Sequence, residues 1–326
     1  MQKIKIISTG YYLPAKVLTN KELEKMIDTT DEWITTRTGI KKRHLASEKE
    51  ASSDMGVIAA RAAMKKIKME PEAVDAIICA TCTPDYFFPS TACQIQKELK
   101  LKNAFGFDIS AACSGFIYAL TIAEAMLAHG NIKTVLVVAT EKMSGIADWE
   151  DRSTCILFGD GAGAAILRKE EGKSGILSTY LGSDGTLGDL LIVPGGGSRK
   201  PPSKETIKNK DHYIKMKGNE VFKVAVHRMC ESAVKAIELA GLKPEDIKLL
   251  IPHQANLRII NAIAKRLNLT EKQVFVNLDK TGNTSAASIA ISLAEAEDNK
   301  MLKRGDIVLL VSFGAGFTWA GMVLRW

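Results

Sequence analysis

Two side chains of the sequence stand out as candidates for nucleophilic catalysis. Cys113 lies in the small-residue segment 108–116, where an apolar helix is expected to begin. The positive end of a helix dipole stabilises a thiolate, which is the nucleophilic form of cysteine. His253 follows the apolar segment 249–252, and a side chain at the carboxyl end of a strand often faces the site of an α/β protein. Each residue could instead be an ordinary buried side chain.

Asn283 becomes a third candidate because the sequence contains an internal repeat. Segments 62–80 and 232–252 are each typical of an amphipathic helix, a Pro-Glu turn and an apolar strand. Cys113 follows the first of these prolines by 42 residues, and Asn283 follows the second by 39. Both lie in small-residue turns that lead into a helix and then an apolar strand. The repeat predicts two related halves, packed face to face, with Cys113 and Asn283 converging between them.

The alternation of helices with Val/Ile/Leu-rich segments predicts an α/β fold whose strands are buried on both faces. We expect the halves to meet near residues 169–174, giving an N-terminal half of 1–171 and a C-terminal half of 172–326. Residues 307–324 are 18 uncharged residues in a row, which is long enough to span a membrane. Because this run contains three glycines, it is better interpreted as two buried strands joined by a turn. We therefore expect no membrane association.

Composition excludes several classes of protein. Of 326 residues, 46% are hydrophobic and 25% are charged, as in ordinary globular proteins and unlike disordered, collagenous or coiled-coil chains. The net charge of +7 is too small to indicate nucleic acid. The excess is local, since residues 199–228 hold nine basic and three acidic side chains, which suggests an acidic partner or a phosphorylated ligand. Six cysteines and no apparent secretory signal predict a cytoplasmic protein with reduced thiols.

Two weaker motifs carry little functional weight. Cys79 and Cys82 have the spacing of a redox or zinc pair, but no second pair completes a zinc site. Segment 159–165 is rich in glycine, but it lacks the dinucleotide-binding spacing and leads into a strand rather than a helix. We therefore expect no metal site and no nucleotide cofactor.

Seven motifs spread over nearly the whole chain resemble the thiolase superfamily of condensing enzymes, and most closely its bacterial 3-oxoacyl-[acyl-carrier-protein] synthase III family. They span residues 30–40, 88–95, 108–116, 157–163, 218–223, 253–259 and 313–319. The resemblance implies a thiolase-like fold, in which two duplicated αβαβαββ halves form a five-layered α-β-α-β-α core. Elongating members of the superfamily have a second histidine where this chain has Asn283. The resemblance therefore points to an initiator of type II fatty acid biosynthesis.

The resemblance also implies an acyltransferase mechanism, a decarboxylating Claisen condensation. Cys113 would take an acyl group from an acyl-CoA, with acetyl-CoA expected first, and would condense it with malonyl-acyl carrier protein. The products would be CoA, 3-oxoacyl-carrier protein and CO2. His253 and Asn283 would donate hydrogen bonds to the malonyl thioester carbonyl. The backbone amides of Cys113 and Gly316 would form an oxyanion hole. No cofactor or metal is implied.

Binding residues follow from the same resemblance. The residues implied for CoA are Trp33 and Arg152 at the adenine, Arg37 near the phosphates, and Gly218 and Asn256 along the pantetheine tunnel. The residues implied for docking the acidic acyl carrier protein are Lys223, Gln254, Ala255, Asn256, Leu257 and Arg258. Phe88 would reach the acyl pocket of a partner subunit, which implies a homodimer.

Other interpretations compete with this one. The order Cys, His, Asn is also that of papain-like proteases, but the flank of Cys113 differs and the repeat is unexplained by that fold. An RNA-binding scaffold would use the basic stretch, yet only Tyr213 and Phe222 could stack on bases there. Starter enzymes of polyketide pathways stay open, as do the choice of acyl primer and the role of the Lys-rich loop, residues 199–217.

Overall fold

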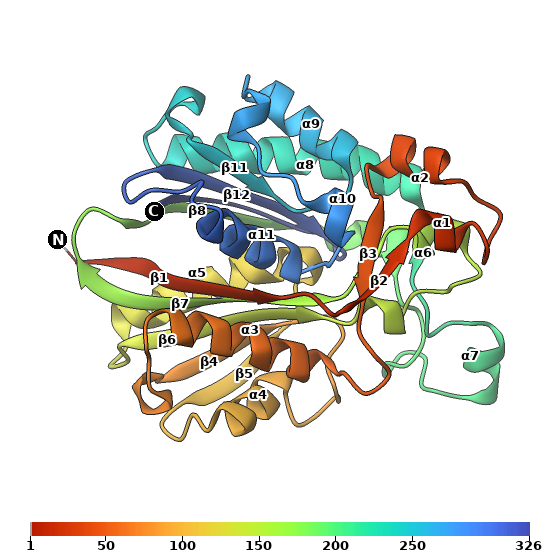
Figure 1. Cartoon of the computed structure of the whole chain (residues 1–326), viewed down its shortest axis with the longest axis horizontal. Coiled ribbons are helices and arrows are strands. Elements are labelled where there is room, and N and C mark those ends of the chain that lie inside the picture. The colour runs from red at the N-terminus through yellow and green to blue at the C-terminus, as the bar shows by residue number, and fades with distance from the viewer. Residues whose placement is uncertain (1) are drawn as a thin grey trace.

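Apolar strands and amphipathic helices alternate along the chain, and the computed structural model, which describes residues 2–326, stacks them in five layers (Figure 1). Two sheets lie roughly parallel, with two helices between them and helices on each outer side. This arrangement buries both faces of each sheet, which is why the central strands are mainly apolar. The predicted five-layered α/β architecture is confirmed.

The N-terminal half forms a five-stranded sheet in the order β1-β7-β6-β4-β5. Strands β4, β5 and β6 run parallel, whereas β7 is antiparallel to both β1 and β6. Two helices cover the outer face and α5 covers the inner face. The strands are β1 (Gln2–Tyr12), β4 (Ala76–Ala80), β5 (Phe105–Ile109), β6 (Thr134–Glu141) and β7 (Gly161–Glu171). The helices are α3 (Ser52–Lys66), α4 (Thr91–Leu99) and α5 (Gly115–His129).

The C-terminal half forms a four-stranded sheet in the order β11-β12-β13-β8. Strands β11 and β12 are parallel, and the other two pairings are antiparallel. Helix α8 covers the outer face with α9 packed beside it, and α11 lies next to α5 in the central layer. The strands are β8 (Gly175–Ser183), β11 (Leu249–Pro252), β12 (Ile307–Gly314) and β13 (Thr318–Arg325). The helices are α8 (Gly218–Leu239), α9 (Leu257–Arg266) and α11 (Ala287–Asp298).

The two sheets have the same order of strands, as the repeat predicted. Reading β5-β4-β6-β7-β1 beside β11-β12-β13-β8 leaves only β5 without a full counterpart. An isolated parallel bridge between Leu250 and Val274 stands at that position. The chain passes from the first sheet to the second between β7 and β8, at residues 172–174. The central hydrophobic cluster takes side chains from both halves, so the halves share one core.

The uncharged run near the C-terminus forms strands, as expected. β12 and β13 pair antiparallel from Ile307 opposite Arg325 to Gly314 opposite Thr318. One other stretch, Ala112–His129, is helical, long and apolar enough to cross a membrane. Most of it is α5, which lies between the sheets and packs in the central hydrophobic cluster. Its apolar character is therefore explained by burial in the protein core.

Short elements gather at one end of the sheets, on the right in Figure 1, near the carboxyl ends of the parallel strands. They are β2 (Lys16–Thr19), α1 (Asn20–Leu23), α2 (Asp31–Thr38), β3 (Lys42–Leu45), α6 (Arg152–Cys155), β9 (Leu191–Ile192), α7 (Lys204–Lys208), β10 (Lys215–Met216) and α10 (Leu278–Thr281). Single 3-10 turns span Pro71–Ala73, Ala112–Ser114, Met143–Gly145, Gly185–Leu190, Pro244–Asp246 and Glu271–Gln273. Ligands of open α/β folds bind at this end of parallel strands.

Candidate active site

The carboxyl ends of the parallel strands meet at one pocket, which Cys113, His253 and Asn283 line together. Cys113 comes from the turn between β5 and α5, His253 follows β11, and Asn283 precedes α11. Most of the other lining side chains are apolar, so the wall of the pocket is mainly apolar. The structure thus brings together the three side chains that the sequence singled out.

Small residues allow the Cys113 turn to fit between the two sheets. Ala112 has a φ of 45°, in the left-handed region, and a 3-10 turn then leads into the first turn of α5. A Cβ on Gly115 would lie 3.1 Å from the Cβ of Ala80. A Cβ on Gly314 would lie 2.6 Å from the backbone nitrogen of Cys113. A side chain at Gly115 would push the turn away from β4, and one at Gly314 would push it away from β12, so glycine at both positions keeps the sulfur in the pocket.

Cys113 is a neutral thiol in the resting protein. Burial raises the pKa of Cys113 to about 12, and a hydrogen bond to Ser285 Oγ at 3.4 Å opposes that rise only in part. The position at the start of the helix therefore does not bring the pKa of Cys113 down to neutral pH, because the hydration that the anion loses on burial raises it. The sulfur needs a proton acceptor when it attacks.

His253 is held as a neutral imidazole. Its backbone N–H donates to the carbonyl of Val311 at 2.8 Å, which continues the pairing of β11 with β12. Its Nδ1 lies 2.6 Å from Ser288 Oγ on α11. Burial lowers the pKa of His253 to about 3, so the ring is uncharged at neutral pH. Because Nδ1 is engaged within the protein, Nε2 is the ring nitrogen left for a ligand.

The amide of Asn283 is oriented by its own turn. Its Oδ1 accepts a hydrogen bond from the backbone N–H of Ser285 at 2.9 Å. Its backbone N–H donates to Leu157 and its carbonyl accepts from Gly159, so the residue is fixed on both sides. With Oδ1 turned toward Ser285, the Nδ2 amino group is the part of the amide left for the pocket. The site therefore offers a neutral ring nitrogen and a neutral amino group beside a thiol.

The residues predicted for CoA form a continuous set. The Trp33 ring on α2 has the guanidinium carbon of Arg152 5.0 Å from its centroid and that of Arg37 at 5.8 Å. Asn256 Nδ2 donates to the Arg37 carbonyl at 3.0 Å, and Asn256 and Gly218 line the Cys113 pocket. An aromatic ring flanked by two guanidinium groups suits a flat base with phosphates. The set thus leads from the surface toward the sulfur.

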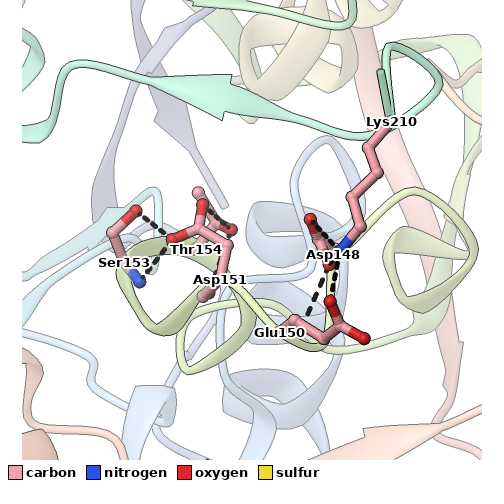
Figure 2. A network of polar contacts seen from close by, with 6 residues as sticks. All are labelled: Asp148, Glu150, Asp151, Ser153, Thr154 and Lys210. Atoms are coloured by element: carbon pink, nitrogen blue, oxygen red, sulfur yellow. Dashed lines mark hydrogen bonds and ion pairs between the residues drawn. The ribbon is translucent and has the colours of Figure 1, made fainter. Parts of the chain in front are cut away.

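The Lys-rich loop supports the segment that carries Arg152 (Figure 2). Lys210 Nζ lies 3.2 Å from Asp148 Oδ1 and also pairs with Glu150. Asp151, the residue after Glu150, caps helix α6 and accepts from the backbone N–H of Ser153 at 2.9 Å. The Lys-rich loop, to which the sequence analysis could assign no role, is therefore attached to the segment whose Arg152 contacts the Trp33 ring.

Two of the basic residues predicted for carrier docking lie at the mouth of the pocket. The guanidinium carbon of Arg258 is 5.0 Å from the centroid of the Phe222 ring, and that ring lines the pocket. Arg258, at the start of α9, and Lys223, in the first turns of α8, are both exposed. Ala255 and Asn256 line the pocket itself, and Leu257 is half-buried. An acidic protein could therefore approach the pocket along this basic rim.

Gln254 is the exception, and its predicted contact with the carrier is contradicted. Its side chain is fully buried. Nε2 donates to the carbonyls of Pro252 and Phe275, and Oε1 accepts from the backbone amides of Asn277 and Leu278. All its hydrogen-bonding capacity is used inside the protein. Gln254 therefore shapes the loop after β11 rather than presenting a surface.

Phe88 and Gly316 lie apart from the pocket that contains Cys113. Phe88 is 86% exposed, beside Phe87 at 83% and Tyr86 at 59%, and the three line a separate surface cavity. At the end of β12 it is Gly314, not Gly316 in the following turn, that lines the Cys113 pocket. The predicted role of Gly316 in the oxyanion hole is therefore not supported by a contact with the pocket. Phe88 lies outside the pocket of its own chain, so it could contact an acyl group only in the pocket of a second subunit.

Three residues of this region were missed by the sequence analysis. Ser288 fixes the ring of His253, Ser285 touches the Cys113 sulfur, and Glu141 accepts a hydrogen bond from Ser285 Oγ at 3.0 Å. Glu141 offered one signal, since it is an acidic residue that ends an otherwise uncharged strand, residues 134–141. The serines offered none, because they belong to a run of small residues typical of any tight turn.

Comparison with known proteins agrees with this geometry. Residues 107–185 match the family described as 3-oxoacyl-[acyl-carrier-protein] synthase III, and residues 237–326 match the family of its C terminal part. The chain is 54% identical to a beta-ketoacyl-[acyl-carrier-protein] synthase III of Caldanaerobacter subterraneus over 98% of this chain and 97% of that protein.

Solved structures show the same fold over the whole chain. The crystal structure of 3-oxoacyl-[acyl-carrier-protein] synthase III from Aquifex aeolicus is 52% identical, with a TM-score of 0.92 over 99% of this chain and 100% of that one. The priming beta-ketosynthase of the R1128 polyketide pathway is 37% identical, with a TM-score of 0.92 over 99% of this chain and 96% of that one.

Proposed function

Because the chain belongs to the 3-oxoacyl-[acyl-carrier-protein] synthase III family, we propose that the pocket around Cys113 carries out both halves of an initiating condensation. The enzyme is an acyltransferase of fatty acid biosynthesis. It joins an acyl group to malonyl-acyl carrier protein with loss of CO2. The observation that carries the assignment of residues is the meeting of a thiol and two neutral donors in one apolar pocket.

In the first half, Cys113 attacks the thioester carbonyl of an acyl-CoA and CoA leaves as a thiolate. Negative charge develops on the carbonyl oxygen, and a backbone amide aimed at that oxygen lowers the barrier. The Cys113 N–H is one donor, and Gly316 is the predicted second. The missing side chain of Gly314 supports the first of these, because a Cβ there would lie 2.6 Å from the Cys113 nitrogen and would cover its N–H. The apolar lining keeps water from hydrolysing the acyl-enzyme.

In the second half, malonyl-carrier protein replaces CoA. Its carboxylate leaves as CO2, and the bonding electrons form an enolate whose charge gathers on the thioester oxygen. His253 donates to that oxygen from Nε2, with the Ser288 hydroxyl donating to Nδ1, and Asn283 donates from Nδ2. The enolate carbon attacks the acyl carbonyl, and Cys113 leaves as a thiolate that regains a proton. No metal or cofactor is required.

The CoA moiety lies along the predicted CoA-binding residues, which lead from Trp33 at the surface to Asn256 in the pocket. The adenine stacks on the Trp33 ring, and the Arg152 guanidinium, which lies 5.0 Å from the centroid of that ring, moves outward to flank the base. Arg37 neutralises phosphate, and the pantetheine arm passes Gly218 and Asn256. The Arg37–Trp33–Arg152 cluster supports this path, because its flat, cationic faces match a base and phosphates.

The function is tested by supplying a panel of acyl-CoA primers with malonyl-carrier protein and identifying the products by mass spectrometry. We expect one CO2 and one 3-oxoacyl-carrier product per primer consumed, with acetyl-CoA used efficiently. Hydrolysis of the primers without condensation would contradict the assignment. The same panel distinguishes acetyl from branched primers and therefore tests a role in a specialised polyketide pathway.

We predict that Arg258→Glu weakens the use of malonyl-carrier protein while leaving acyl transfer from CoA nearly intact. The substitution reverses a charge at the pocket mouth, which an acidic partner would meet at close range. KM for malonyl-carrier protein is the measurement, and we expect a rise of about tenfold, the effect of 1.4 kcal/mol.

Lys133→Glu is the matched control for the Arg258 variant. Lys133 is exposed and precedes β6, at the edge of the sheet opposite the pocket. The control should leave KM unchanged. Equal loss of carrier use and acyl transfer in the Arg258 variant would refute a docking role.

A homodimer is proposed from the exposed aromatic run Tyr86–Phe87–Phe88. Contiguous large apolar side chains at such exposure usually belong to an interface. We predict that Phe88→Asp shifts the mass in solution, measured by light scattering, from two chains toward one and lowers acyl transfer. Leu239→Asp, a change at another exposed apolar residue at the end of α8, should stay dimeric. A wild-type protein that is monomeric would overturn the proposal.

We also propose that the enzyme works in the cytoplasm as a protein without nucleic-acid or membrane partners. All six cysteines, which lie within the described residues 2–326, are free thiols, in keeping with a reducing compartment. A Cys113 nucleophile also needs that compartment, because oxidation would block acylation.

A further inference from the structure

A buried carboxylate lies beside the pocket, and the mechanism described so far does not use it. Glu141 ends β6 and is fully buried. It accepts hydrogen bonds from the side-chain hydroxyls of Thr81 and Thr83, from the amide and thiol of Cys82, and from the hydroxyl of Ser285. None of these donors is a cation. A carboxylate buried with neutral partners alone is costly, which is unusual for a residue with only a structural role.

Ser285 connects this carboxylate to the reactive sulfur. The Cys113 Sγ lies 3.4 Å from Ser285 Oγ, and Ser285 Oγ lies 3.0 Å from Glu141 Oε1. The serine is held in place by its left-handed backbone, with φ at 49°, and by the bond from its N–H to Asn283. The three groups therefore form a hydrogen-bonded chain from the thiol, which lines the pocket, to the buried Ser285 hydroxyl and the buried Glu141 carboxylate.

We propose that Ser285 transfers the Cys113 thiol proton to Glu141 when the sulfur attacks acyl-CoA, and returns it when the sulfur leaves. The inference rests on the proposed function, in which Cys113 is the nucleophile. Ser285 touches the reacting sulfur and is the catalytic member of the chain. Glu141 acts through it, as a positioning residue that receives the proton.

The ionisation of the neighbouring groups favours this route. Burial holds the pKa of Cys113 at about 12, so the thiol must lose its proton during attack rather than before it. Burial lowers the pKa of His253 to about 3, which makes that imidazole a poor proton acceptor. Burial raises the pKa of Glu141 above its usual value, which makes its carboxylate a better one. Cys82, the other titratable side chain in contact with Glu141, is kept protonated by the same burial.

The proton balance closes over both half-reactions. On attack, the S–H bond of Cys113 breaks and its proton passes to Ser285 Oγ, while the Ser285 hydroxyl proton passes to Glu141 and the S–C bond to the acyl group forms. CoA leaves as a thiolate and takes a proton from solvent. In the condensation, the S–C bond breaks and Cys113 leaves as a thiolate. Glu141 then returns its proton through Ser285, so one proton from solvent is consumed per turnover.

The test compares Ser285→Ala with the wild-type enzyme in a rapid-quench measurement of acyl-enzyme formation from acetyl-CoA. We expect the maximal acylation rate to fall about 100-fold or more, the usual contribution of a positioned proton acceptor. The acetyl-CoA concentration for half-maximal acylation should stay unchanged, because the serine does not bind CoA. Ser285→Cys, which keeps a group able to pass a proton and adds no branch at Cβ to this left-handed position, should recover part of the rate.

Ser178→Ala is the matched control, because it also removes one serine hydroxyl. Ser178 Oγ donates to the carbonyl of Ala236 at 2.6 Å and lies outside the Cys113 pocket. The control should acylate at nearly the wild-type rate. Glu141→Gln should resemble Ser285→Ala, and Ser285→Ala remains decisive if that variant does not fold. A Ser285→Ala enzyme with wild-type acylation, or a Ser178→Ala enzyme equally slow, would overturn the relay.

The outcomes also separate the relay from the assignment of the nucleophile. If Ser285→Ala is acylated normally but Cys113→Ala is not, the relay alone is refuted. If Cys113→Ala still becomes acylated, the proposed function of Cys113 fails and the relay fails with it.

Discussion

Replacing Cys113 with alanine is expected to abolish acyl-enzyme formation completely. Incubation with acetyl-CoA alone should increase the mass of the wild-type protein by one acetyl group, and the variant should show no increase. The reason is chemical, since alanine has no atom that can form the thioester. Condensation should fall by several orders of magnitude, as it does when a covalent nucleophile is removed from other enzymes. Intact-protein mass spectrometry followed by peptide mapping is the measurement.

Cys230→Ala provides the control for this experiment. Cys230 is a half-buried free thiol on α8 that packs against α9, outside the Cys113 pocket. Its loss should leave acetylation intact, which shows that the effect belongs to Cys113 and not to any thiol. A Cys113→Ala protein that still gains an acetyl group, on any residue, would refute the assigned role.

The duplicated architecture could be predicted from sequence because its signals are periodic and local. The Pro-Glu turns at Pro71 and Pro244 both became 3-10 turns that lead into β4 and β11. The apolar segments after each central helix became β6 and β12. Strand and helix periodicity survive in any environment that buries one face or both, so such patterns can be recognised without coordinates.

The proton chain could not be predicted, because it joins three segments distant in the sequence. Ser285 lies 172 residues from Cys113 and 144 from Glu141, and no spacing relates them. The burial of Gln254 was hidden for a related reason. The side chain of a glutamine next to His253 can point to solvent or into the protein. Here the carbonyls of Pro252 and Phe275 accept hydrogen bonds from its Nε2 and hold it inside. The raised pKa of the Cys113 thiol could not be predicted either, since desolvation depends on which residues cover the sulfur.

Replacing His253 or Asn283 with alanine is expected to stop condensation while sparing acyl-enzyme formation. Each side chain offers one neutral donor to the enolate oxygen, and loss of one such donor costs about 2.7–4 kcal/mol, or about 10²–10³ in rate. The measurements are acetylation by mass spectrometry and CO2 release from malonyl-carrier protein. Both variants should be acetylated normally. Loss of acetylation instead would mean that these residues serve the first half-reaction.

Asn283→Asp sharpens this test, because it changes charge with almost no change in shape. An ionised carboxylate is acceptor-only and places a negative charge where the enolate charge must gather, so this variant should condense more slowly than Asn283→Ala. In the wild-type enzyme, His253 is neutral at any pH above about 3, so protonation of this ring should not lower the condensation rate between pH 5 and pH 8. An Asn283→Asp enzyme that decarboxylated malonyl-carrier protein as fast as wild type would contradict this role. It would show that the reaction needs no amide donor from residue 283 and that no negative charge develops beside it.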